Sequence, residues 1–233
     1  MPHKPASRGS ARESQYELDV GFSTGQTAAV PVAAPRVPLQ SRAVKTRGAL
    51  LTAAAREFAA RGYAGTTSKS IADRARVATG SFYQYFESKD VVLRELAAMR
   101  LGEIGQRTVA LLERGESGPA PTRERLGAVV GLVMDLHRED PALHAVMTER
   151  RHADPQLEAI WGAGERALVE RIAALLERWG AAADPLARAF VVFGLVEGSV
   201  HAHVLGHPVV SDDRFITALV DALVCIVGPA ANP

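Results

Sequence analysis

Residues 66–89 read TTSKSIADRARVATGSFYQYFESK, and their spacing predicts two short helices joined by a tight turn and followed by the start of a third. Thr67 or Ser68 can cap the first short helix by accepting a hydrogen bond from a first-turn amide. Thr79 can cap the second, which we expect to end near Phe86, and Ser88 can cap the longer helix that follows. Two short helices around a tight turn are the layout of a DNA-reading module.

The second short helix has two faces with different chemistry. At about 100° per residue, Phe82 and Phe86 return to one side, and we expect them to anchor the helix in a core. Hydroxyl, amide and phenol groups on the other faces suit base edges and phosphates in a DNA major groove, and a glycine lets the backbone come close. The positions left for this partner are Gly80, Ser81, Tyr83, Gln84 and Tyr85.

The competing interpretation is that these aromatic residues form a dense core patch. Four aromatic side chains within the five residues 82–86 cannot all face one core from a helix. The preceding helix also has its own complete apolar stripe, formed by Leu51, Ala54, Ala55 and Phe58. The spacing therefore favours DNA binding over a core patch.

Residues from about 47 to 99 resemble the N-terminal domain of the tetracycline-repressor (TetR) family of bacterial regulators. The resemblance lies in the strings ALLTAAAREFAARGY, TTSKSIADRA and GSFYQYFESKD, in this order. It implies that Thr67, Tyr83 and Lys89 contact phosphates, and a lysine beside the first amides of a helix suits that role. The positions that it places against the groove are Ser68, Thr79, Gly80, Ser81 and Tyr85, and we expect Lys69 and Gln84 on the same surface.

Two residues depart from the family pattern in the turn between the short helices. Arg76 stands where the family usually has glycine, and Ala78 where it often has serine. A residue with a Cβ is strained in a left-handed turn. We expect capping to shift to Thr79, and neither change touches the phosphate or groove positions.

Charge, cysteine content and apolar runs limit the classes of protein to which this chain can belong. Lys plus Arg total 27 and Asp plus Glu 26, but the basic excess gathers between residues 42 and 90, on the proposed DNA-binding domain. The single cysteine, Cys225, excludes an intramolecular disulfide, and its apolar surroundings predict a buried structural thiol. The apolar runs near residues 190 and 216 are interrupted by charged and polar residues, so we expect no membrane span and a cytoplasmic protein.

The chain divides into three parts by composition and pattern. Residues 1–41 have no sustained period and predict a flexible arm, either without a task or adding contacts to DNA. Residues 42–101 form the predicted helix-turn-helix domain, and residues 102–233 a helical ligand-binding and dimerisation domain. Because no strand-like alternation appears, the predicted fold class is all-α.

In the second part of the chain, Asp-Pro pairs predict where three helices begin. Asp-Pro pairs at 140–141, 154–155 and 184–185 each precede an apolar-periodic segment, as expected of a capping aspartate followed by proline in the first turn. A further helix is predicted from about Thr122 to His137 and a last one from Ser211, with a loop near residues 115–121.

The last two predicted helices are apolar on more than one side. A two-fold interface that uses both helices of each subunit would bury the second side, and the TetR resemblance implies this homodimer. Two identical DNA-reading domains would then meet two half-sites about 34–36 Å, or a multiple of that, apart on a near-palindromic operator.

The remaining helices are expected to enclose a ligand pocket with apolar walls and a few polar anchors. Ordinary core packing is the alternative for each methionine or tryptophan. Glu197, inside an apolar helix, needs a partner or a raised pKa. The histidines His201, His203 and His207 lack a matching ligand pattern, so we predict no metal site and no cofactor. The candidate pocket residues are Met99, Met134, His137, Met147, Trp161, Glu165, Phe193 and Glu197.

Together these features predict a DNA-binding repressor, bound to its double-stranded operator as a homodimer and released by a small apolar or amphipathic effector. The alternative is a helical enzyme or small-molecule carrier that retains a helix-turn-helix remnant. We predict no enzyme, because the sequence contains no nucleophile motif, no paired catalytic carboxylates and no phosphate-binding glycine loop.

Overall fold

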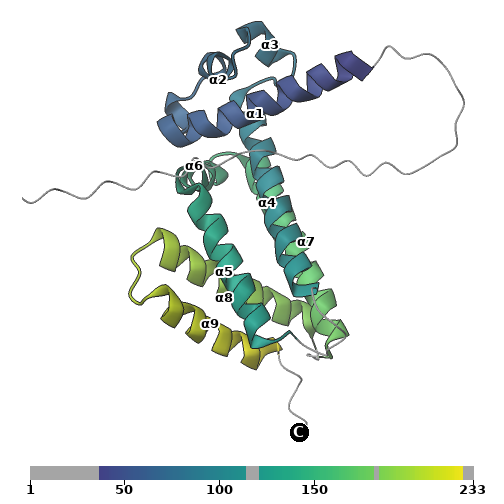
Figure 1. Cartoon of the computed structure of the whole chain (residues 1–233), viewed down its shortest axis with the longest axis vertical. Helices are drawn as coiled ribbons and strands as arrows, with labels where there is room; N and C mark the ends of the chain where they lie inside the picture. The colour runs from purple at the N-terminus through teal and green to yellow at the C-terminus, as the bar shows by residue number, and fades with distance from the viewer. Residues whose placement is uncertain (1–36, 114–120, 181–183, 228–233) are drawn as a thin grey trace, which may run out of the picture.

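The computed structural model describes residues 37–113, 121–180 and 184–227, and within these ranges every regular element is a helix (Figure 1). The predicted all-α class is confirmed. The helices are α1 (Val37–Gly65), α2 (Ser68–Arg74), α3 (Thr79–Tyr83), α4 (Lys89–Glu113), α5 (Arg123–Glu139), α6 (Pro141–Arg151), α7 (Pro155–Arg178), α8 (Pro185–Leu205) and α9 (Asp212–Val227).

The first three helices and the start of α4 form a head, with α2 and α3 on the far side of α1 from the rest of the chain (Figure 1). Helix α1 begins at Val37, inside the segment predicted as an arm, and residues 1–36 lie outside the described residues. Near its end the backbone breaks at Gly62, whose φ of 66° favours glycine. The chain then turns into α2.

One apolar core holds the head together. The predicted stripe on α1 is confirmed, since Leu51, Ala54, Ala55 and Phe58 are all buried. The core also takes in side chains from beyond the head, namely Leu143, Val146 and Met147 of α6 and Leu157 and Trp161 of α7. Helix α6 packs directly against α1, which the sequence did not indicate.

The helix starts in the body follow the sequence prediction closely. Asp140, Asp154 and Asp184 each cap a helix through a side-chain oxygen that accepts backbone N–H groups, with proline in the first turn. Thr122 caps α5 in the same way. Residues 115–120 of the predicted loop lie outside the described residues. Helix α4 crosses the predicted boundary at residues 101–102 without a break, so head and body share one helix.

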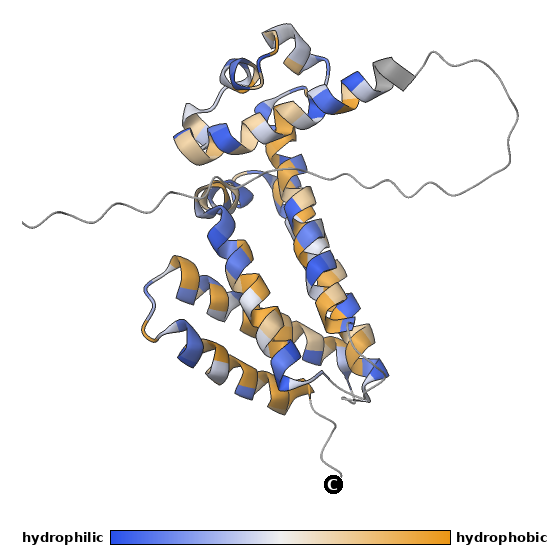
Figure 2. Cartoon of the chain, in the orientation of Figure 1, coloured by the Kyte–Doolittle hydropathy of each residue, from blue (hydrophilic) through white to orange (hydrophobic). Residues whose placement is uncertain are grey.

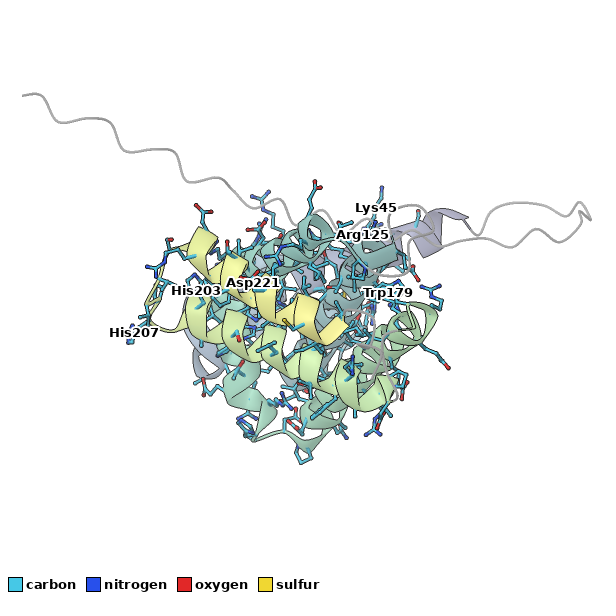
Figure 3. The ribbon with its side chains drawn as sticks, turned by 90° about the horizontal axis from the view of Figure 1, so that it is seen from below. Lys45, Arg125, Trp179, His203, His207 and Asp221 are labelled. Atoms are coloured by element: carbon cyan, nitrogen blue, oxygen red, sulfur yellow. The ribbon has the colours of Figure 1, made fainter. Side chains whose placement is uncertain are left out.

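Helices α8 and α9 lie side by side at the end of the molecule away from α2 and α3 (Figures 1 and 3). They join α4, α5 and α7 in a second apolar core. Both are strongly apolar in Figure 2. Among the described residues, α8 alone is long and apolar enough to cross a membrane by length and composition, and only 17% of its most apolar window is buried within the chain.

The turn between α2 and α3 has the strained geometry that its sequence suggests. Arg76 has φ 57° and is the one non-glycine residue with positive φ in the described part of the chain. The α2–α3 arrangement therefore tolerates a left-handed residue with a Cβ. The turn is also held by N–H groups of Arg76 and Val77, which donate to the carbonyls of Asp73 and Ala72.

Candidate DNA-binding surface and inner cavity

Phe82 and Phe86 anchor α3 in the head core, as predicted. Their exposed fractions are 0% and 2%, and their ring centroids lie 5.8 Å apart. Tyr83, next to Phe82 in the chain, is 59% exposed. A helix of five residues has little stability of its own, so these two phenylalanine side chains fix its position.

Thr67 caps α2 through a reciprocal pair of hydrogen bonds. Its hydroxyl oxygen accepts from the Ser70 backbone N–H at 3.0 Å, and the Ser70 hydroxyl oxygen accepts from the Thr67 N–H at 3.1 Å. The cap predicted at Thr67 or Ser68 therefore lies at Thr67. Ser68 and Lys69 follow in the first turn, and the Lys69 ammonium lies 3.7 Å from the Asp73 carboxylate.

The cap predicted for α3 is wrong. Thr79 is the first residue inside the helix, Ala78 occupies the capping position, and no side chain closes the end. The helix also ends at Tyr83, earlier than predicted, because the chain turns at Gln84 to bring Phe86 into the core. The Thr79 hydroxyl is thereby left free of capping.

The outer face of α3 carries polar groups without internal partners. Among the described residues, Thr79, Ser81, Tyr83 and Gln84 make no side-chain hydrogen bond within the chain. Tyr85 is partly buried against the head core. A Cβ built at Gly80 would meet nothing within 4 Å, so the fold does not require glycine there. The polar face is thus accessible to an outside partner.

Lys89 lies differently from the free lysine that the sequence suggested. Its ammonium donates to the carbonyl oxygens of Tyr63 and Thr66 at 2.7 and 2.8 Å and lies 4.0 Å from the centroid of the Tyr63 ring. Burial lowers the pKa of Lys89, and the nearby Asp90 carboxylate only partly offsets this. An ammonium has three donors, so one remains for an external acceptor.

The basic surface of the head is partly neutralised. Glu57, buried under α2, pairs with Arg74 at 2.5 Å and with Arg61 at 3.3 Å. Burial alone would raise the pKa of Glu57, but the hydrogen bond from Arg74 and the charge of Arg61 outweigh it and lower the pKa. Besides Lys89, which bonds carbonyl oxygens, the cations with no ion pair on the described part of the head are Arg42, Lys45, Arg56 and Arg76.

Two contacts of arginine side chains join the head to the body. The Tyr63 hydroxyl donates to Asp90 within the head, and the Arg150 guanidinium of α6 lies 4.0 Å from the centroid of the same tyrosine ring. Arg94 of α4 donates two hydrogen bonds, at 2.8 and 3.0 Å, to the capping Asp154 of α7. The Arg94 hydrogen bond is the main reason that the pKa of Asp154 is lowered.

The body contains an inner cavity of about 100 Å³ with mostly apolar walls from α4, α5, α7 and α8. Two predicted pocket residues, Met99 and Met134, are not among the residues that line this cavity; Met99 packs against the head core and Met134 is buried in the second core. The predicted residues that do line it are His137, Met147, Trp161, Glu165, Phe193 and Glu197.

Three imidazoles and a carboxylate gather at the cavity end nearest α6. The nitrogen atoms of His137, His144 and His201 that could act as ligands lie within 4.8 Å of one another. Nε2 of His137 lies 3.4 Å from Oε1 of Glu197, so His137 is the partner that the carboxylate of Glu197 was expected to need. Sequence reasoning missed this group, because the histidines come from α5, α6 and α8 and share no spacing.

The pKa values of the group differ with their neighbours. Burial acts to lower the pKa of His137, but the carboxylate of Glu197 and the carbonyl of Val133 outweigh it and raise the pKa. Burial and the charge of His137 lower the pKa of His144 to about 4. Burial acts to raise the pKa of Glu197, but His137 outweighs it, so the pKa is lowered rather than raised.

One other sequence expectation is wrong, and two histidines take separate places. Cys225 is exposed on α9, because the apolar residues on both sides of it turn to the core while its own position faces out. His203 lies in the last turn of α8 and is buried, 2.9 Å from the Asp212 carboxylate and stacked on the Phe215 ring with centroids 4.2 Å apart. His207 is exposed at the turn between α8 and α9 (Figure 3).

Because aromatic anchors hold α3 in place while its polar side chains stay free of internal partners, the head defines a helix-turn-helix DNA-binding domain. Residues 50–96 match the family of bacterial regulatory proteins, tetR family, and residues 121–225 match the tetracyclin repressor-like C-terminal domain. The chain belongs to the TetR family of transcriptional regulators.

Individual relatives agree with this assignment. The chain is 33% identical over 125 residues to the HTH-type transcriptional regulator TcmR of Streptomyces glaucescens, and 30% identical over 105 residues to the uncharacterized HTH-type regulator YdgC of Bacillus subtilis. These matches cover 52% and 45% of this chain and 54% of each relative, so the chain spans about half the length of the curated relatives it matches.

The fold is also found in solved structures. A TetR-family regulator from Mesorhizobium loti superimposes with a TM-score of 0.67 at 17% identity, over 79% of this chain and 98% of that one. At this identity the likeness shows the shared fold.

His144 generates a prediction on stability between pH 6.5 and about 4. The folded protein keeps His144 neutral down to its pKa of about 4, whereas the unfolded chain takes up a proton near the ordinary value of 6.5. The unfolded state therefore binds more protons in this window, and the His144 contribution to the free energy of unfolding is lost as the pH falls. We expect His144→Gln to flatten this decline by up to about 1.4 kcal/mol per pH unit.

The measurement is urea unfolding at several pH values with a chelator present. His207→Gln, which removes an exposed imidazole, is the control and should keep the wild-type slope. Because the comparison concerns slopes, a constant loss of stability in His144→Gln does not affect it. Equal slopes for His144→Gln and wild type would contradict the prediction.

Proposed function

We propose that this TetR-family regulator is a cytoplasmic repressor that binds a near-palindromic operator as a homodimer and releases it when a small apolar or amphipathic effector enters the inner cavity. The observation that carries the DNA part is the outer face of α3, where polar side chains have no partner within the chain. Hydrogen-bonding groups that a fold leaves free on a surface suit base edges and phosphates.

The proposed contacts divide by depth in the groove. Thr67, Tyr83 and the third donor of Lys89 would meet phosphates, and Lys69 adds a cation beside them. The open space in front of Gly80 supports close approach of the α3 backbone to DNA. The groove-facing positions are Ser68, Thr79, Gly80, Ser81, Gln84 and Tyr85.

Tyr83→Phe tests this surface with little risk to the fold, because the hydroxyl makes no internal hydrogen bond. Loss of one charge-assisted hydrogen bond, worth roughly 1.5–3 kcal/mol, should weaken DNA binding roughly 10- to 100-fold. The melting temperature should stay at the wild-type value. The probe is a DNA fragment that the wild-type protein selects from its source genome.

Removal of the hydroxyl at Tyr63, by Tyr63→Phe, is the matched control, because the Tyr63 hydroxyl donates inward to Asp90. Tyr63→Phe should lower the melting temperature, which Tyr83→Phe should not. If Tyr83→Phe protects the selected fragment as well as wild type does, or wild-type binding shows no dependence on salt, the proposed DNA surface is wrong.

The proposed homodimer rests on the outer face of α8. Leu186, Phe190 and Val191 are 55%, 67% and 55% exposed, and the exposed Gly194 and Gly198 continue the face toward the end of the helix. Exposed apolar surface of this kind is typical of association sites, and glycine lets two helices approach closely. The adjoining α9 extends the same face in Figure 3. A four-helix interface would cover both helices.

Phe190→Glu should turn the dimer into a monomer, because it places a charge at the centre of this apolar face. Sedimentation equilibrium measures the mass, and circular dichroism checks that the helices remain. Binding to the full operator should weaken at the same time, since one domain then meets one half-site. Val209→Glu puts the same charge at a 94% exposed position outside α8 and should leave the dimer intact. A dimeric Phe190→Glu protein would refute this interface.

The effector proposal rests on the cavity and on its position beside α4. Ile104 of α4 and Leu168 of α7 line the cavity, and α4 continues from there into the head. An effector that widens the body around this helix can favour a spacing of the two heads that does not fit DNA.

A thermal-shift screen read together with DNA release tests the effector proposal. A compound that occupies the cavity should raise the melting temperature and release the selected DNA fragment. Leu168→Trp fills part of the cavity and should reduce both effects for the same compound. A compound that is chemically converted in the assay would instead support an enzyme, and one that raises the melting temperature while DNA stays bound would contradict release.

A further inference from the structure

His137, His144 and His201 have the composition and geometry of a metal-binding site, and the Glu197 carboxylate lies beside His137 as a fourth potential ligand. The three histidine ligand atoms lie within 4.8 Å of one another, and the carboxylate oxygen lies 3.4 Å from Nε2 of His137. Neighbouring ring centroids are 5.2 to 6.1 Å apart and the ring planes are inclined by 48° to 87°, so the three rings are not stacked. Three imidazoles and one carboxylate make a four-ligand set.

His137 is already oriented as a ligand. Its Nδ1 donates to the Val133 carbonyl oxygen at 2.9 Å, one turn earlier in α5, which directs Nε2 into the cluster. The side chain is 4% exposed, and Nε2 is buried without a hydrogen bond in the described structure. Metal-binding histidines commonly donate their second ring nitrogen to a carbonyl or carboxylate, which fixes the ring.

The spacing suits a small tetrahedral ion. Metal–ligand bonds of 2.0–2.1 Å place tetrahedral donor atoms about 3.3 Å apart, close to the 3.4 Å between His137 and Glu197. The wider gaps can close by rotation of His201, whose side chain is exposed within the single chain.

The donor atoms select the kind of metal. Three nitrogen ligands and one oxygen favour Zn²⁺ and similar first-row ions, whereas Mg²⁺ and Ca²⁺ prefer sites made of oxygen. Arg100 adds a positive charge near the histidines, and Glu197 balances it.

We propose that His137, His144, His201 and Glu197 bind one divalent transition-metal ion of the Zn²⁺ class at the α6 end of the inner cavity. The ion would join α5, α6 and α8, which the four ligands connect. Because α6 packs on α1, the site lies one helix away from the DNA-binding head. The binding itself does not rest on the proposed repressor function.

The test uses the full chain without an affinity tag, freed of metal by chelator and titrated with Zn²⁺ in a calorimeter. The expected result is one Zn²⁺ per chain and a higher melting temperature with the ion present. Co²⁺ in place of Zn²⁺ should give the visible absorption of a tetrahedral nitrogen and oxygen site.

His201→Gln is the main variant, because the side chain is exposed within the chain and its change leaves the core intact. His201 follows Gly198 on the proposed α8 interface, so sedimentation equilibrium checks that the variant keeps the wild-type mass. Affinity for Zn²⁺ should fall at least about tenfold, since loss of even an outer partner of a ligand typically costs 10- to 100-fold. Glu197→Gln should weaken binding too, while His207→Gln, at an exposed histidine outside the cluster, should bind like wild type.

Three results would overturn the proposal. One is the absence of saturable Zn²⁺ binding by the wild-type chain. A second is equal affinity in wild type and His201→Gln, which would place any bound ion elsewhere. The third is loss of binding in His207→Gln alone, which would assign the ion to the surface. The DNA assays described above do not enter this test, so either proposal can fail without the other.

Discussion

The contact on which the rest of the structure depends is that of the Lys89 ammonium with the carbonyl oxygens of Tyr63 and Thr66. These carbonyls belong to the end of α1, where the backbone leaves the helix and its acceptors have no partner within it. Lys89 is the first residue of α4. A single half-buried cation therefore ties the end of α1, the entry to α2 and the start of the helix that runs into the body.

The same junction also connects the head with α6. Arg150 lies on the face of Tyr63, and the apolar residues of α6 enter the head core. At the other end of the same short helix, His144 lines the inner cavity. A change of packing at the cavity can thus reach the head by two routes, along α4 and across α6, each made of contacts in one continuous structure.

Much of the fold followed from local chemistry. The aspartates at the start of α6, α7 and α8 and the threonines before α2 and α5 cap helices because a short polar side chain can satisfy free backbone amides wherever it stands in sequence. The anchoring of α3 by Phe82 and Phe86 also followed, because helical spacing decides which side chains share a face. Thr79 is not the cap because the extended residue before the helix is Ala78, and Thr79 is already the first residue inside α3.

The exposure and contacts of side chains that depend on helix packing could not be predicted from the sequence. The exposure of Cys225, the burial of His203 and the engagement of Lys89 depend on which neighbouring helix covers each face, and no spacing within one helix records that. The gathering of His137, His144 and His201 depends on three helices crossing at one point. The sequence by itself determined most of the helices, the aspartate and threonine caps of the body, and the burial of Phe82 and Phe86 that leaves the polar face of α3 outside, because these depend on residues a few positions apart. Only the tertiary structure decided the cavity, the histidine cluster and the junction between head and body, because these join residues that packing alone brings together.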